Sequence, residues 1–79
     1  MARSVVIMVV DNNGRGLSGH KVNAYNRDKC YTDRDGQVTL QLETSNTTIY
    51  VNGLTAYDGT VSRMDNVMSF DTCGRKYQP

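Results

Sequence analysis

The strongest constraint on the fold is a strict alternation of apolar and polar side chains at residues 37–43, QVTLQLE. Val38, Leu40 and Leu42 fall on one side of an extended chain, and the polar residues fall on the other. This period is typical of a β-strand with one buried face. Because the preceding YTDRDG (31–36) contains Asp-Gly, it is predicted to form a hairpin turn between a short strand at 29–32 and this strand.

The same segment raises the alternative of a calcium-binding loop, because Asp33 and Asp35 are two residues apart. An EF-hand loop needs oxygen ligands at positions 1, 3 and 5, glycine at position 6 and glutamate at position 12. Counted from Asp33, the glycine comes at position 4 and Thr44 occupies position 12. The spacing therefore favours the turn, and no metal site is predicted.

The rest of the chain also divides into short extended segments separated by turn residues. The apolar run 5–10 is predicted to be a strand buried on both faces, and the glycine-rich segment 11–19 a loop. Further strands are expected at 20–26, 47–53, 60–63 and 67–73, with a turn at 57–59. In the first two of these, Val22, Ala24, Ile49 and Val51 are expected to face inward. No segment has helical periodicity, and no internal repeat is apparent, so the pattern indicates an all-β sandwich or small barrel.

A family resemblance rests on VVDNNGRGLSGHKVNAY (9–25) followed by CYTDRDGQVTLQL (30–42). This order of strand, Asp-Gly loop, strand and TD-x-DG turn resembles the carboxypeptidase-regulatory-like and transthyretin-like sandwiches. The resemblance implies a small immunoglobulin-like, antiparallel β-sandwich of about seven short strands. It also implies that the loop 11–19 carries the chain from one sheet to the other. The hydroxyisourate-hydrolysing branch of that group ends in YRGS, whereas this chain ends in GRKYQP, so its activity is not carried over.

Length and charge bound the partners. A chain of 79 residues forms one domain with a thin core, in which 74–79 is expected to be a frayed tail. The net charge of +1, without a basic run, disfavours nucleic acid as a partner. No stretch is apolar and long enough for a membrane span, and the N-terminus does not resemble a signal peptide. A cytoplasmic protein, or one assembled into a larger particle, is therefore expected.

The residues with reactive side chains do not form a recognisable catalytic or cofactor site. His20 is the only histidine, and no serine lies in a G-x-S-x-G motif, so no catalytic residue and no cofactor are predicted. Cys30 and Cys73 are left with two alternatives. Without an export signal two free thiols are the default, but a disulfide between them would stabilise so small a domain by roughly 4 kcal/mol.

Tyrosines supply the candidate binding residues, because exposed tyrosines are enriched in interfaces. Tyr25, Tyr31, Tyr50 and Tyr57 fall on strands or at strand ends, and Tyr25 and Tyr50 lie opposite the inward aliphatic residues. The structural alternative is that they fill the edges of a core that has one Phe and no Trp. The expected function is a non-catalytic module for protein binding, self-association or assembly, for example a phage or bacterial accessory protein. Carbohydrate binding is the alternative, and binding of single-stranded nucleic acid is a third, less favoured class.

Overall fold

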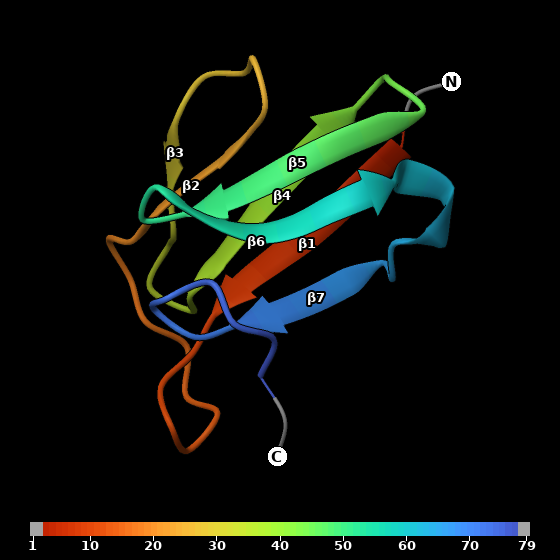
Figure 1. Cartoon of the computed structure of the whole chain (residues 1–79). Helices are drawn as coiled ribbons and strands as arrows, with labels where there is room; N and C mark the ends of the chain where they lie inside the picture. Colours follow the sequence, from red (N-terminus) through yellow and green to blue (C-terminus); the bar gives the residue numbers. More distant parts are fainter. Residues whose placement is uncertain (1–2, 78–79) are drawn as a thin grey trace.

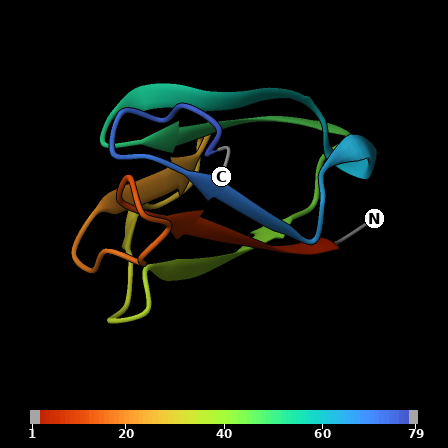
Figure 2. The same cartoon turned by 90° about the horizontal axis from the view of Figure 1, so that it is seen from below.

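The computed structural model describes residues 3–77, which fold into seven β-strands and one 3-10 turn. The elements are β1 (Arg3–Val9), β2 (Lys21–Ala24), β3 (Cys30–Tyr31), β4 (Gln37–Leu42), β5 (Asn46–Val51), β6 (Leu54–Thr60), η1 (Val61–Arg63) and β7 (Val67–Phe70). One sheet has the strand order β4-β1-β7 and the other β3-β2-β5-β6 (Figure 1). The sheets lie one above the other as two layers (Figure 2). The predicted all-β sandwich of about seven short strands is confirmed.

The loop that follows β1 connects the two layers. β1 belongs to the three-stranded sheet and β2 to the four-stranded one, so residues 11–20 carry the chain across, as expected. The strand pairs are antiparallel except β1 and β7, which run parallel with Val6 beside Val67 and Val9 beside Phe70. This departs from the expected antiparallel sandwich. The reason is that the chain leaves β6 in the other layer and crosses through η1 to the end of the sheet at which β1 begins.

The core lies between the sheets and comes from one side of each alternating strand. The inward faces of β4, β2 and β5 are those predicted. In β1 only Val5, Ile7 and Val9 are fully buried, whereas Val6 and Met8 are half-buried on the outer face. The expectation that this strand is buried on both faces is therefore wrong, because the chain provides no third layer in the described residues. The largest fully buried side chains are Phe70, Ile7, Ile49, Val5, Val9, Val22 and Val51.

Three turns share one hydrogen-bond pattern, and we call them the aspartate turns (Asp11–Arg15, Asp33–Gln37 and Asp71–Arg75). In the first, Asp11 Oδ1 accepts from the N–H groups of Asn13 (2.9 Å) and Arg15 (3.0 Å). The Gly14 N–H donates to the Asp11 carbonyl (3.0 Å), and the Asp11 N–H donates to the Arg15 carbonyl (2.9 Å). The same four bonds, 2.9–3.1 Å long, close the other two turns. A short D-x-x-G-x unit is thus repeated three times, contrary to the expectation that the sequence has no internal repeat.

The aspartate turns gather at one end of the molecule. β1 and β7 run parallel, and each is followed by an aspartate turn, Asp11–Arg15 and Asp71–Arg75. β4 runs antiparallel to β1 and begins at the last residue of the turn Asp33–Gln37, so this turn lies at the same end. The turn at 33–37 was predicted, but it joins β3 and β4, which lie in different sheets. It is therefore a tight turn between the two layers and not a hairpin, because β4 pairs with β1 and not with β3.

The second half of the chain differs most from the expectation. Residues 57–59 were expected to form a turn, but they lie inside β6, and 60–63 is not a strand because Val61–Arg63 is the 3-10 turn. The tight turn is Asn52-Gly53, between Val51 and Leu54, with φ of 52° and 82°. Asn-Gly is a strong signal for such a two-residue hairpin, because both central residues need positive φ.

The first and last described residues are held by specific contacts. The Arg3 guanidinium donates to the carbonyl groups of Val61 and Met64 and to Asn66 Oδ1 (3.1 Å), which fixes η1 against the start of β1. At the other end, the Tyr77 N–H donates to the Ser69 carbonyl (3.0 Å), and Lys76 forms a bridge with Phe70. Residues 74–77 are therefore paired with the last strand and not frayed, and 78–79 lie outside the described residues.

Candidate functional site

Three of the four predicted tyrosines lie on one surface, the outer face of the sheet β3-β2-β5-β6. We call this surface the tyrosine face and define it by Lys21, Asn23, Tyr25, Tyr31 and Tyr50. Tyr31 is paired with Lys21, and Tyr50 with Asn23, so each pair points to the same side of the sheet. Tyr25 directly follows β2 and continues its alternation, with its N–H donating to the Thr48 carbonyl (2.7 Å). The strands therefore place three aromatic rings on a hydrogen-bonded framework.

The rings of the tyrosine face differ in their exposure. Tyr25 is 69% exposed and Tyr31 63%, whereas Tyr50 is half-buried between its cross-strand neighbours Asn23 and Thr55. An exposed tyrosine offers a large apolar ring with a polar tip at a small cost in conformational entropy. The face carries one cation, Lys21. Its chemistry therefore suits a partner with mixed polar and apolar groups better than a chain of phosphates.

Tyr57 does not belong to this face. It is paired with Ile49 in the ladder, so its ring points inward and packs against the core, and its hydroxyl donates to the Thr60 carbonyl (2.7 Å). For this residue the structural alternative, a tyrosine that fills the edge of the core, is the one realised. The fifth tyrosine, Tyr77, lies over Gly14 of the first aspartate turn, where an added Cβ would come within 2.8 Å of its hydroxyl oxygen.

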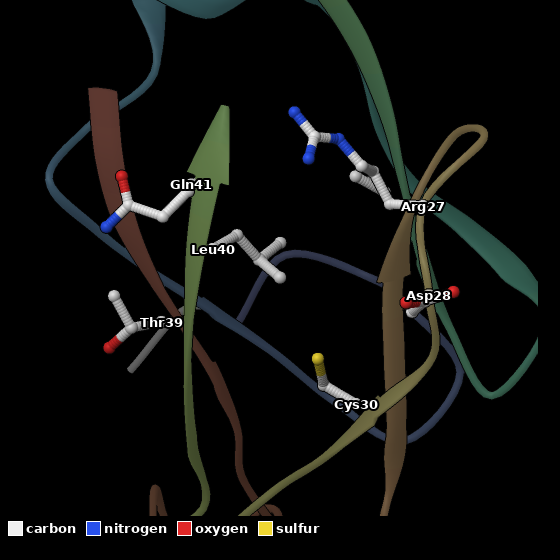
Figure 3. A pocket seen from close by; sticks show the side chains of 7 residues that line it. Arg27, Asp28, Cys30, Thr39, Leu40 and Gln41 are labelled. Carbon is white, nitrogen blue, oxygen red and sulfur yellow. The ribbon is translucent and has the colours of Figure 1, made fainter. Parts of the chain in front are cut away.

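The two cysteines are both free thiols in the structure, so the alternative of a disulfide between them is not realised. Cys73 is exposed, at the third position of the last aspartate turn. Cys30 is half-buried in β3 and points into a shallow groove (Figure 3). We call this the β4 groove. It separates Arg27, Asp28 and Cys30 from Thr39, Leu40 and Gln41.

Charged groups cluster at the end formed by the aspartate turns, but their hydrogen bonds are structural. The N–H groups of Arg15 and Asn13, which donate to the Asp11 carboxylate, lower its pKa below the ordinary value of 3.8. The His20 Nδ1 lies 3.1 Å from Asn52 Nδ2, which also donates to the Thr72 carbonyl (2.9 Å). This arrangement ties the β5–β6 turn to the last aspartate turn, and no carboxylate among residues 3–77 is hydrogen-bonded to the imidazole.

Neither a metal centre nor a membrane-spanning helix emerges from the described part of the chain. Within residues 3–77, no three side chains of His, Cys, Asp or Glu come together closely enough to hold a metal ion. No helix there has the length and apolar character needed to cross a membrane. A function therefore has to be argued from three surface features: the tyrosine face, the β4 groove and the end of the molecule that carries the aspartate turns.

Comparison with known proteins adds no relative to this description: no family model, no curated protein and no solved structure matches the chain.

Proposed function

We propose that the protein is a non-catalytic binding module that recognises another protein through the tyrosine face. One observation supports this most directly: Tyr25 and Tyr31, at 69% and 63% exposure, stand on the same face of a four-stranded sheet. Tyrosines that pack in the core give no such surface, as Tyr57 illustrates. Because the rings are anchored by strand pairing, binding them requires little further ordering of the main chain.

Polar groups between the rings supply the directional part of the recognition. Lys21 and Asn23 lie between Tyr31 and Tyr25 along β2 and its neighbours, and on β5 the Thr48 hydroxyl donates to Asp58 (3.1 Å). A partner surface that covers the rings would thus meet hydrogen-bonding groups of both kinds and a single positive charge. A folded protein with a mixed polar and apolar patch fits these requirements.

The test compares three baits in the lysate of the source cells: the wild type, Tyr25→Ala/Tyr31→Ala, and Val67→Ala. Val67 is a suitable control because it is 53% exposed but belongs to the other sheet. We expect a protein that the wild type and the control retain and the double variant loses. With that protein purified, each single Tyr→Ala change should weaken binding by about tenfold or more. Equal retention by the double variant would contradict the proposal.

Carbohydrate binding is the second candidate, because exposed rings interleaved with Asn23 and Lys21 offer both stacking and hydrogen bonds to a sugar. Titration with oligosaccharides distinguishes it. A saturable change in tyrosine fluorescence that disappears in the double variant would favour a sugar over a protein. Binding of single-stranded nucleic acid would instead show an affinity that falls steeply with salt.

The finer structural class also belongs to this proposal. We place the chain with the immunoglobulin-like and transthyretin-like sandwiches, on the strength of its TD-x-DG turn and the loop that crosses between layers after β1. In such a setting a role as an accessory or assembly component is natural, in the cytoplasm or within a larger particle. Fold class and binding site are separate claims, since one fold serves many functions.

A further inference from the structure

β4 has a free edge whose main-chain groups can be assigned from the register. The Val9 N–H donates to the Gly36 carbonyl (2.8 Å), whereas both main-chain groups of Gln37 bond to Asp33, on the side away from β1. Antiparallel ladders alternate in this way from one residue to the next. The N–H and C=O groups of Thr39 and Gln41 therefore also point away from β1, toward the edge of the sheet, and both residues are exposed.

This edge lacks the features that normally prevent strands from pairing between molecules. Proteins protect edges with charged residues, proline, bulges, very short strands or a covering segment. β4 has six residues, QVTLQL, without charge or proline, and its register with β1 is uninterrupted. The other edges are protected. β3 has two residues, β6 is paired through an irregular register, and Tyr77 bonds to the outer side of β7.

The β4 groove runs beside this edge, between β4 and the segment of the other sheet that contains Arg27, Asp28 and Cys30. Leu40 points into it from β4 and Cys30 points toward Leu40 from β3 (Figure 3). Arg27 and Asp28 line the opposite wall, and the Arg27 guanidinium forms an ion pair (3.6 Å) with Glu43, which directly follows β4 in the same chain. Because Arg27 is neutralised by Glu43 within the chain and the net charge is only +1, charge repulsion between two copies that meet at this edge is small.

We propose that a second copy of this chain occupies the free edge, with the two β4 strands antiparallel about a two-fold axis beside Leu40. In this register Thr39 of each copy faces Gln41 of the other, and their free groups form four main-chain hydrogen bonds. The product is one continuous sheet in the order β7-β1-β4-β4-β1-β7. This interface is an edge of the sheet β4-β1-β7, whereas the tyrosine face is the outer face of the other sheet, so a failure of the edge pairing does not bear on the proposed function.

The first test measures molar mass by sedimentation equilibrium from micromolar to millimolar concentration, with Cys73→Ser as the background and reductant present to exclude disulfide dimers. We expect a reversible dimer. Thr39→Pro and Gln41→Pro should be monomers, because proline removes an N–H that points to the edge and leaves the β1 ladder intact. Thr39→Ala keeps the N–H group and should remain dimeric. A background protein that is monomeric throughout would overturn the proposal, and so would proline variants that dimerise equally well.

A second measurement keeps the proposal testable if the proline variants fail to fold. Amide hydrogen exchange of the background protein compares Thr39 and Gln41 with Val38 and Leu40, whose N–H groups bond to β1 in either state. The amides of Thr39 and Gln41 should be protected at high concentration and lose that protection on dilution, whereas those of Val38 and Leu40 should not change. Fast exchange of the Thr39 and Gln41 amides at high concentration would overturn the proposal, even if an added extended peptide protected them.

Discussion

Val10 and Phe70 are joined by a main-chain hydrogen bond of 2.8 Å, and each is followed directly by an aspartate turn. After each turn the chain returns and forms a β-bridge with the residue that precedes the turn: Gly16 with Val10, and Lys76 with Phe70. The parallel strands β1 and β7 thus carry two copies of one strand-and-turn unit, side by side.

Gly36 should be far less tolerant of substitution than Gly19, although φ is positive at both, 77° and 78°. A Cβ at Gly36 would lie 2.6–2.7 Å from main-chain atoms of Leu17, Gly16 and Val9, whereas nothing lies within 4 Å at Gly19. We expect Gly36→Ala to lower the free energy of unfolding by more than about 3 kcal/mol. Gly19→Ala should lower it by about 1 kcal/mol, from backbone strain alone. Urea unfolding of both variants checks this, and equal losses would contradict the close packing around Gly36.

Arg3 should stabilise the fold through the carbonyl groups that it bonds. Arg3→Met keeps much of the apolar stem but leaves the Val61 and Met64 carbonyls without these donors. We expect a loss of about 1–3 kcal/mol in the free energy of unfolding, with a smaller loss for Arg3→Lys, which retains a donor. An unchanged denaturation midpoint in Arg3→Met would show that solvent replaces the guanidinium without cost.

Asp11 should contribute stability that depends on pH. Its pKa is lowered in the folded protein by hydrogen bonds from Arg15 and Asn13, so the charged carboxylate is favoured by folding. The resulting stabilisation is present above the ordinary pKa of 3.8 and is lost as the pH falls through the lower folded value. The stability difference between the wild type and Asp11→Asn should therefore shrink in acid. Asp65→Asn removes the same charge outside the aspartate turns, and a difference with the same acid dependence there would refute the assignment.

The two thiols should react at different rates. Cys73 is exposed, whereas Cys30 is half-buried beside Leu40. A thiol-reactive disulfide reagent under native conditions should label two thiols in two phases, and Cys73→Ser should remove the fast phase. If no thiol reacts without reductant and two thiols react after reduction, the cysteines form a disulfide.

The sequence predicts the parts of the fold that follow from local alternation. Val38, Leu40, Leu42, Ile49 and Val51 face inward as expected, because a two-residue period fixes which side of a strand is buried. The predicted turn at 57–59 is wrong, because Asp58-Gly59 resembles a turn but lies inside β6. The hairpin turn is formed by Asn52-Gly53, a stronger turn signal that lies within the predicted strand 47–53. Which strands become neighbours depends on contacts between residues far apart in the chain. The parallel pairing of β1 and β7 therefore cannot be predicted from the local pattern of the sequence.

For the candidate site, the alternation of the sequence predicts on which side of a strand a tyrosine lies, but not how the tyrosines are arranged together. The alternation placed Tyr25 and Tyr50 opposite the core residues, and the structure adds Tyr31 through its pairing with Lys21. Tyr57 falls on the other face because the register of β5 and β6 shifts between Ile49 and Tyr50. The three D-x-x-G-x segments are visible in the sequence, and their fixed spacing was the signal that could have revealed the aspartate turns.

The pairing of residue 9 with residue 70 has a consequence for how the protein is made. Until the ribosome has released β7, β1 has only β4 beside it, and the Phe70 side chain is missing from the core. A nascent chain that ends before β7 leaves one edge of β1 without a neighbour, including the Val6 N–H that donates to the Asn66 carbonyl in the complete fold. The domain should therefore fold after synthesis of β7 and not progressively, and during translation β1 is the segment most in need of a chaperone.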